Sequence, residues 1–294
     1  MIEWKKDMTQ QPLAYLNAEF LDSAEARPIR ILSEYLEPLR RFKEQKIQDT
    51  IVFFGSARVD SRERAERALA TLRARGVRYT DDQYEAELNK GRKAVEWARY
   101  YEEARELARK LTAWSTTLRY ENHRFVVTSG GGPGIMEAAN RGAREAGGKT
   151  IGLNIRLPFE QGANPFITDG LHFEFHYFFM RKFWFAYLAK ALVIFPGGFG
   201  TCDELFEILT LVKTDKLSRQ IEIILYGSDY WDEVLAFKPM AEWGAIADYD
   251  LDLLHRADSP SDAFERLQAK LIANHLEPAT QQEKAAPGIA KTRG

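Results

Sequence analysis

The sequence predicts an α/β fold, in which an open parallel sheet carries helices on both faces. From residue 125 onward, short apolar runs alternate with amphipathic helical patterns. These runs are continuously apolar, as expected for strands that are covered on both faces. With 294 residues, 45% of them hydrophobic, the chain is long enough to bury a sizeable core.

The first half of the chain is predicted to add helices to this sheet. Residues 1–48 form an N-terminal helical extension, with amphipathic stretches over 13–21 and 29–42. The run from Ile51 to Phe54 then enters a glycine turn, as a buried strand would. Residues 61–118 are charged and helical in pattern, and we interpret them as a helical insertion that ends in one long helix over 84–118.

The main domain is predicted to span residues 49–276. Its further strands cover 125–128, 150–155, 172–177, 191–195 and 221–226, and its helices cover 135–146, 180–190, 203–214 and 230–243. The last segment, 277–294, is polar and contains proline and glycine, so we expect a disordered tail.

Composition narrows the functional classes. Lys plus Arg number 41 and Asp plus Glu 43, so the basic excess that general nucleic-acid binding needs is missing. A single cysteine, Cys202, excludes an internal disulfide framework. No apolar stretch is long enough for a signal peptide or a membrane span, so we expect a cytoplasmic protein without a membrane partner.

Two segments share one design, in which a strand, a glycine-rich turn and a helix follow one another. The first glycine loop is Ser129–Gly134 and the second is Pro196–Thr201. Glycine allows close approach of a ligand, and the helix N-terminus offers free N–H groups, so both loops are predicted phosphate cradles. Neither loop fits G-x-G-x-x-G, and the Walker-like residues 148–150 enter a strand, which argues against a dinucleotide site or an ATPase.

The second loop continues into a specific motif, P-G-G-x-G-T-x-x-E, over residues 196–204. Together with the Gly-Gly-Gly loop and the pair Arg181-Lys182, it resembles the LONELY GUY (LOG) family of cytokinin riboside 5′-monophosphate phosphoribohydrolases, long labelled possible lysine decarboxylases. The resemblance implies a Rossmann-like fold and a homodimer or larger assembly. It also implies hydrolysis of purine nucleoside 5′-monophosphates to free base and ribose 5-phosphate, with no cofactor and no metal.

The same resemblance implies roles for individual residues. Arg181 and Glu204 match the catalytic pair. The positions matched to substrate binding are Gly131, Gly132, Gly134, Glu160, Lys182, Gly197, Gly198, Phe199, Gly200, Thr201, Cys202, Asp203 and Thr210. The chain departs from the family in its long insertion, in its N-terminal helices and in Phe178-Phe179, which replace a Met-His pair.

The chemistry is consistent with this assignment. Cleavage of an N-glycosidic bond builds positive charge on the ribose, and a carboxylate can stabilise that charge and orient water. We expect Glu204 in the first turn of the helix after the second loop, with Glu207 raising its pKa and Arg181 binding phosphate or Glu204. The alternative for Glu204 is a residue that only complements the helix dipole.

Other interpretations remain open. A nucleotide or cofactor carrier on the same fold is the main rival, since fold does not determine function. A decarboxylase would need a lysine for pyridoxal phosphate, and neither loop places one. We interpret Cys202 as a packing residue, and His172 and His176 as ordinary strand residues rather than metal ligands.

The predicted helix 180–190 is aromatic around much of its circumference. Its rings cannot all face one core, so a second surface must cover some of them. The candidates are the inserted helix and another subunit. We therefore predict a homodimer in which Trp184 or Phe183 is buried by association.

Overall fold

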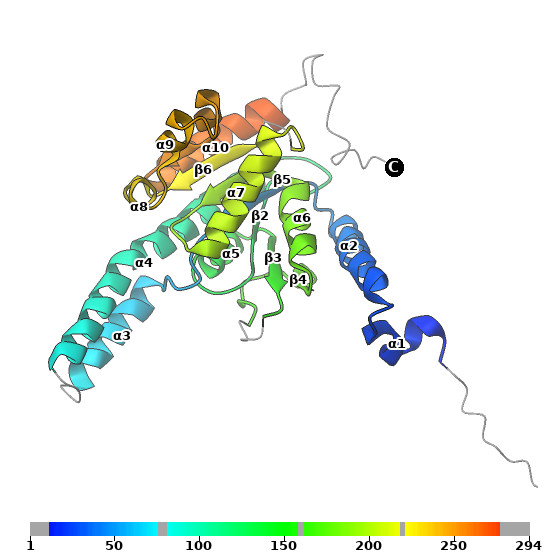
Figure 1. Cartoon of the computed structure of the whole chain (residues 1–294), viewed down its shortest axis with the longest axis horizontal. Coiled ribbons are helices and arrows are strands. Elements are labelled where there is room, and N and C mark those ends of the chain that lie inside the picture. Colours follow the sequence, from blue (N-terminus) through cyan, green and yellow to red (C-terminus); the bar gives the residue numbers. More distant parts are fainter. Residues whose placement is uncertain (1–11, 76–80, 158–161, 218–220, 277–294) are drawn as a thin grey trace, which may run out of the picture.

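The computed structural model describes residues 12–75, 81–157, 162–217 and 221–276 (Figure 1). The predicted tail, 277–294, lies outside these ranges. Seven strands form one sheet in the order β4-β3-β2-β1-β5-β6-β7, and every neighbouring pair is parallel. The strands are β1 (Thr50–Phe54), β2 (Val126–Ser129), β3 (Thr150–Ile155), β4 (His172–Phe175), β5 (Ala189–Ile194), β6 (Glu222–Tyr226) and β7 (His255–Ala257).

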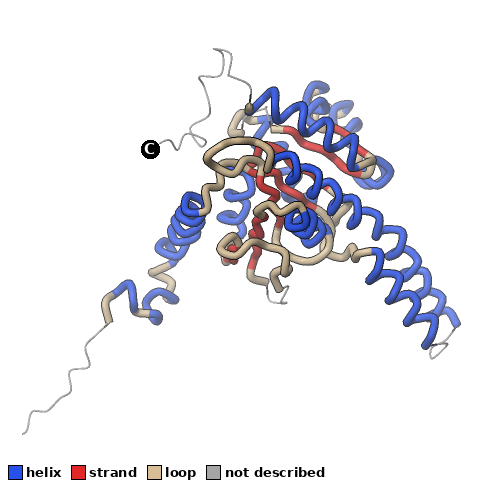
Figure 2. Tube along the Cα trace, turned by 180° about the vertical axis from the view of Figure 1, so that it is seen from behind, coloured by secondary structure: helices blue, strands red, loops and turns tan. Residues whose placement is uncertain are grey.

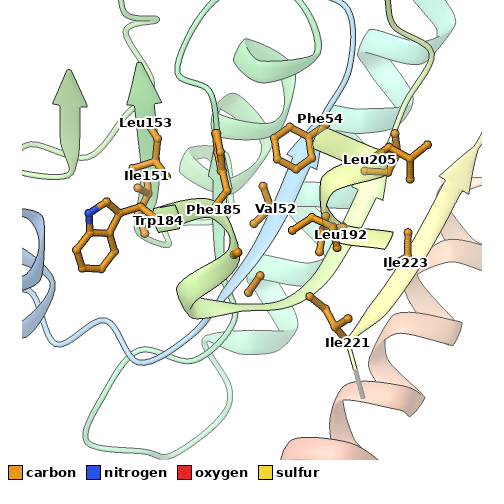
Figure 3. Packing of buried hydrophobic residues seen from close by; sticks show 14 of the residues in the cluster. Val52, Phe54, Ile151, Leu153, Trp184, Phe185, Leu192, Leu205, Ile221 and Ile223 are labelled. Atoms are coloured by element: carbon orange, nitrogen blue, oxygen red, sulfur yellow. The ribbon is translucent and has the colours of Figure 1, made fainter. Parts of the chain in front are cut away.

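Helices cover both faces of the sheet, which confirms the predicted fold class. Side chains alternate along β1, so that Val52 and Phe54 enter one core and Ile51 and Phe53 enter the other. Figure 3 shows Val52 and Phe54 beside the side chains of α6 and α7. The first face carries α2 (Arg27–Glu44), α6 (Phe178–Leu188) and α7 (Phe199–Lys213); the second carries α4 (Asp81–Ser115), α5 (Ile135–Glu145) and α10 (Pro260–His275).

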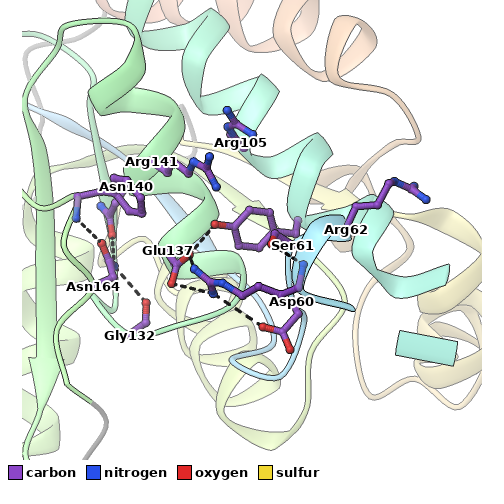
Figure 4. A network of polar contacts seen from close by, with 12 residues as sticks. Asp60, Ser61, Arg62, Arg105, Gly132, Glu137, Asn140, Arg141 and Asn164 are labelled. Carbon is purple, nitrogen blue, oxygen red and sulfur yellow. Dashed lines mark hydrogen bonds and ion pairs between the residues drawn. The ribbon is translucent and has the colours of Figure 1, made fainter. Parts of the chain in front are cut away.

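The insertion forms a helical arm made of α3 (Arg62–Arg75) and α4, which pack against each other and extend away from the sheet (Figures 1 and 2). The predicted long helix therefore exists as α4, and its C-terminal half lies along α5. A buried polar contact joins the arm to α5: Tyr101 Oη donates to Glu137 Oε1 at 2.7 Å, and Arg64 pairs with the same carboxylate. The arm is thus anchored to the helix that follows the first glycine loop (Figure 4).

The N-terminal helices are α1 (Ala18–Asp22) and α2, and α2 covers the aromatic helix α6. Tyr35 stacks on Trp184 with ring centroids 5.7 Å apart, and Trp184 Nε1 donates to the carbonyl of Glu34 at 2.9 Å. Trp184 is only 2% exposed within the single chain. The expectation that subunit association buries Trp184 is therefore wrong, because its second partner is α2. The homodimer itself stays a prediction.

Several helix boundaries differ by a few residues from the sequence-based expectation, and one predicted helix is divided in two. Helix α7 begins at Phe199 rather than at residue 203, since the first turn of a helix needs no intrahelical N–H partners and tolerates Gly200. The predicted helix 230–243 is two short helices, α8 (Ser228–Val234) and α9 (Phe237–Glu242), with Leu235 extended between them. Pro239 explains the break, because it has no N–H for the carbonyl of Leu235 and its ring crowds that carbonyl.

The remaining elements are short: the 3₁₀ helix η1 (Ala14–Leu16) precedes α1, and a second one, η2 (Asp248–Leu253), lies between α9 and β7. No helix among the described residues is long and apolar enough to cross a bilayer.

The contact between α2 and α6 is open to a direct test. Trp184→Phe removes the donor to the Glu34 carbonyl and part of a buried ring, so we expect a loss of about 1–3 kcal/mol in the free energy of unfolding, measured in urea. Trp243→Phe is the matched control, because Trp243 is 89% exposed and should leave stability unchanged. Equal stability of the two variants would show that α2 does not hold α6.

Candidate active site

A cavity of about 770 Å³ opens at the carboxyl edge of the sheet. Its walls come from residues 55–58 after β1, Gly130 after β2 and residues 197–202 after β5. The strand order reverses between β1 and β5, and loops that diverge at such a point leave a crevice for ligands. The cavity therefore lies where an open parallel sheet is expected to bind a small molecule.

The second glycine loop presents an open helix N-terminus to this cavity. Gly198 is the N-cap of α7, and its carbonyl accepts from the backbone N–H groups of Thr201 and Cys202, each at 3.0 Å. A side chain at Gly197 would collide with Thr201 Oγ1, whereas one at Gly198 or Gly200 would meet nothing within 4 Å. Protein packing requires Gly197 to be small, but Gly198 and Gly200 leave free space in front of the helix, where an anion can approach.

The first glycine loop is built differently. A Cβ on Gly131 would lie 1.9 Å from Asn154 Oδ1, and one on Gly134 would lie 2.3 Å from the carbonyl oxygen of Ser56; both glycines also have positive φ. The first N–H group of α5, that of Ile135, already donates to Ser56 O at 3.1 Å. Packing within the protein therefore explains these glycines.

The carbonyls of the first loop are also held from behind. Asn164 Nδ2 donates to Gly131 O and Gly132 O, each at 3.1 Å, and to Asn140 Oδ1 at 2.9 Å (Figure 4). Gly131, Gly132 and Gly134 are buried and do not line the cavity, which Gly130 and Met136 reach instead. Of the two loops, the second therefore leaves room for an anion in front of its helix, whereas Gly131, Gly132 and Gly134 are enclosed by protein atoms.

Arg181 and Glu204 meet in the cavity wall. Arg181 Nη2 donates to Glu204 Oε1 at 3.1 Å, and the two side chains are 16% and 4% exposed. Phe178 and Phe185 place their rings 5.4 and 5.5 Å from the guanidinium. Glu204 lies in the second turn of α7, not in the first as expected, because the helix begins at Phe199.

Burial dominates the electrostatics of this pair. It raises the pKa of Glu204 to about 7, although the positive charges of Arg181 and Lys182 act in the opposite direction. Glu207 contributes to the rise as expected, but less than burial does. Burial also lowers the pKa of Arg181, and within the described chain its Nε has no hydrogen-bond partner. The site therefore holds a carboxyl group that titrates near neutrality and a donor that is free to bind a ligand.

Lys182 and Asp203 form a second layer beside this pair. Lys182 Nζ lies 2.8 Å from both Asp203 Oδ2 and Glu207 Oε2, outside the cavity lining. Burial disfavours the charge on Lys182, but its hydrogen bonds to these carboxylates outweigh burial and raise its pKa. Lys182 is thus paired with protein carboxylates. It does not line the cavity, and it acts on the site through its positive charge, which favours the ionised form of Glu204.

The other sequence-predicted residues divide into two groups. Phe199, Thr201 and Cys202 line the cavity, with Phe199 97% exposed at its rim. Burial raises the pKa of the Cys202 thiol, in keeping with a packing role. Thr210 is exposed two turns away, where its hydroxyl donates to Phe206 O at 2.7 Å, and Glu160 lies outside the described residues.

Sequence reasoning missed several residues of the cavity wall, among them Arg58, Trp97 and Tyr230. Tyr230 Oη donates to Gly197 O at 2.8 Å, and the ring of Trp97 lies edge-on to that of Tyr230 at 5.6 Å. These two rings and Val234 also line a neighbouring cavity of about 710 Å³. Trp97 belongs to an apolar stripe of α4 that otherwise faces the core. Its position in the helical repeat therefore predicts a core residue and gives no sign that it lines the cavity.

The described residues contain no group of three or more His, Cys, Asp or Glu side chains arranged to hold a metal. His172 and His176 lie in and just after the edge strand β4, and their backbone groups contact α2: His172 O accepts from Arg41, and His176 N donates to Glu34 at 2.7 Å.

Comparison with known proteins supports the resemblance found in the motif. Residues 136–267 match the family model described as possible lysine decarboxylase. The cytokinin riboside 5′-monophosphate phosphoribohydrolase LOG of Oryza sativa subsp. japonica is 28% identical over 158 residues. The predicted resemblance to the LOG family is confirmed. The alignment covers 52% of this chain and 57% of the rice protein's length.

The segment that matches this family model includes Arg181, Glu204 and the second glycine loop, while α2, α3 and α4 lie outside it. Among solved structures, a molybdenum cofactor binding protein from Rippkaea orientalis is 20% identical, with a TM-score of 0.42 over 58% of this chain and 86% of that chain. A Moco carrier protein from Chlamydomonas reinhardtii is 19% identical, with a TM-score of 0.43 over 77% and 99%. These two likenesses concern the fold alone.

The contrast between the two glycine loops makes a prediction about glycine. Gly200→Ala should leave stability unchanged or raise it by up to about 1 kcal/mol, because alanine favours a helix, and should weaken the binding of inorganic phosphate by crowding the space in front of α7. Gly131→Ala should instead lower stability, because its Cβ would meet Asn154. Thermal unfolding and calorimetric titration with inorganic phosphate check both effects; a Gly200→Ala protein that binds phosphate as the wild type does would contradict an anion site at this loop.

Proposed function

We propose that this chain hydrolyses the N-glycosidic bond of purine nucleoside 5′-monophosphates, either AMP or its cytokinin-type derivatives. The products are the free base and ribose 5-phosphate, and the reaction needs water but no cofactor. The observation that carries the proposal is the buried pair Arg181–Glu204 in the same cavity as the open N-terminus of α7. The LOG-type motif around these residues supports it.

The spacing of the two features suits a ribose 5-phosphate. Glu204 follows the N-cap Gly198 by six residues, or about 9 Å along a helix axis. A phosphate bound at the N-terminus of α7 would thus leave the ribose near the Glu204 carboxylate. Binding energy from the phosphate then positions a reacting centre that the phosphate itself does not touch.

The reaction breaks the C1′–N bond, and the bonding electrons leave with the base. The ribose ring gains positive charge in the transition state, which an ionised Glu204 stabilises. Glu204 also accepts a proton from the attacking water, whose hydroxyl joins C1′. That proton is passed to the departing base, so each turnover consumes one water and restores the carboxylate.

A carboxyl group with a pKa of about 7 suits this role. A general base works best when its pKa lies close to the working pH, because it is then both ionised and basic enough to take a proton. Arg181 holds the carboxylate on one side, while its free Nε–H can hydrogen-bond to an oxygen of the ribose or phosphate.

The proposal is tested with AMP, prenylated AMP and adenosine. The wild-type protein should release free base from the two nucleotides, detected by chromatography, and far less from adenosine, which lacks the phosphate. Glu204→Gln should lower base release at least about 100-fold while AMP affinity stays within about tenfold, because the amide keeps the shape without the charge. Binding of AMP by the wild-type protein without base release would favour the carrier interpretation, and unchanged turnover in the variant would remove Glu204 from catalysis.

The pKa of Glu204 also predicts the pH dependence. If ionised Glu204 is required, kcat/KM should fall about tenfold per pH unit below pH 7, since the free enzyme then carries the protonated form. Glu207→Gln removes a like charge and should move the midpoint to lower pH. A midpoint near 6 in both proteins would instead report the second ionisation of the substrate phosphate.

A further inference from the structure

We infer that Arg58 binds the phosphate of the ligand, together with the N-terminus of α7. The inference deepens the proposed function and takes its substrate class from it. Arg58 lies in the loop between β1 and α3, and it is one of the residues that line the 770 Å³ cavity. Neither the motif nor the catalytic pair includes it.

The first argument is the distribution of positive charge. Arg58 and Arg181 are the cationic residues that line the cavity in the described chain. Arg181 is paired with Glu204, and Lys182 outside the cavity is paired with Asp203 and Glu207. The structure gives the Arg58 guanidinium no hydrogen bond or ion pair with any described residue. Among the residues that the structure describes, Arg58 is therefore the cavity cation whose charge no carboxylate offsets.

The second argument is where the backbone places Arg58. The N–H of Ser56 donates to Pro196 O at 2.9 Å, which ties the loop after β1 to the start of the second glycine loop. Ser56 Oγ accepts the N–H of Arg58 at 3.1 Å, and the next residue, Val59, is 2% exposed. The backbone of Arg58 is thus fixed on both sides, beside the cradle, while its side chain can turn toward a ligand.

The third argument is the charge that a phosphate monoester brings. At neutral pH it carries between 1.5 and 2 negative charges, as an approximate range, whereas a helix N-terminus offers about half a positive charge. Arg181 adds little net charge while Glu204 is ionised. A guanidinium can supply the missing charge and donate two parallel hydrogen bonds to phosphate oxygens.

Arg62 provides a matched control. It lies four residues after Arg58 at the start of α3, lines the neighbouring cavity rather than this one, and has Glu66 4.0 Å away. Arg62→Gln removes the same charge from nearly the same part of the surface. It therefore separates binding by Arg58 from a general loss of positive charge.

The test compares Arg58→Gln, Arg58→Lys and Arg62→Gln for affinity toward AMP and adenosine by calorimetric titration. Arg58→Gln should weaken AMP binding about 10- to 100-fold and leave adenosine binding unchanged, because only AMP carries the phosphate. Arg58→Lys should recover part of the loss, since lysine keeps the charge but not the forked donors. Arg62→Gln should change neither affinity more than about twofold.

Two results would overturn the inference: equal losses for AMP and adenosine in Arg58→Gln, or no loss for AMP. Thermal unfolding of Arg58→Gln should match that of the wild type, and a folded variant with normal AMP affinity would be decisive against it. Because the readout is affinity, it is independent of turnover. A wild-type protein that binds AMP but releases no base would end the proposed hydrolysis and still leave the role of Arg58 measurable.

Discussion

The backbone of Ser56 joins the three loops on which the candidate site depends. Its N–H donates to Pro196 after β5, and its carbonyl accepts the N–H of Ile135 at the start of α5. Because β1 lies between β2 and β5, these two bonds set the ends of all three strands relative to one another. Gly134 makes the second bond possible, since any side chain there would collide with the Ser56 carbonyl. The cavity at the strand reversal takes its shape from this close approach.

The same contact gives two similar glycine loops different tasks. At the first loop, the Ser56 carbonyl already accepts the first N–H group of the helix, and the side-chain amide of Asn164 donates to the carbonyls of Gly131 and Gly132. At the second, the helix N-terminus faces a space that Gly198 and Gly200 leave free. Sequence similarity between the loops reflects a shared need for tight turns, and the neighbouring backbone decides which of them can accept an anion.

The fold was largely predictable because continuous apolar runs indicate strands covered on both faces, and the observed sheet has them. The helix that packs against α6 could not be predicted, because an apolar stripe shows that a face is buried but not which element buries it. In the structure that element is α2, which covers Trp184. The motif predicted that Arg181 and Glu204 belong together. It could not show that burial raises the pKa of Glu204 more than Glu207 does. Nor could it show that Trp97 lines the cavity, because the apolar residues of α4 recur at the spacing expected for a helix packed on the core.

A comparison within the molecule shows why the Arg181–Glu204 pair differs from a structural ion pair. Arg124 and Asp49 are also buried, and Arg124 Nε donates to Asp49 Oδ2 at 2.6 Å. There the second carboxylate oxygen accepts the N–H of Phe125, and a further guanidinium nitrogen donates to His275 O, so the pair is satisfied by the fold. Arg181 instead keeps a buried Nε without a partner in the described chain, beside a cavity. Leaving such a donor unpaired costs folding free energy, and a ligand oxygen can recover that cost on binding.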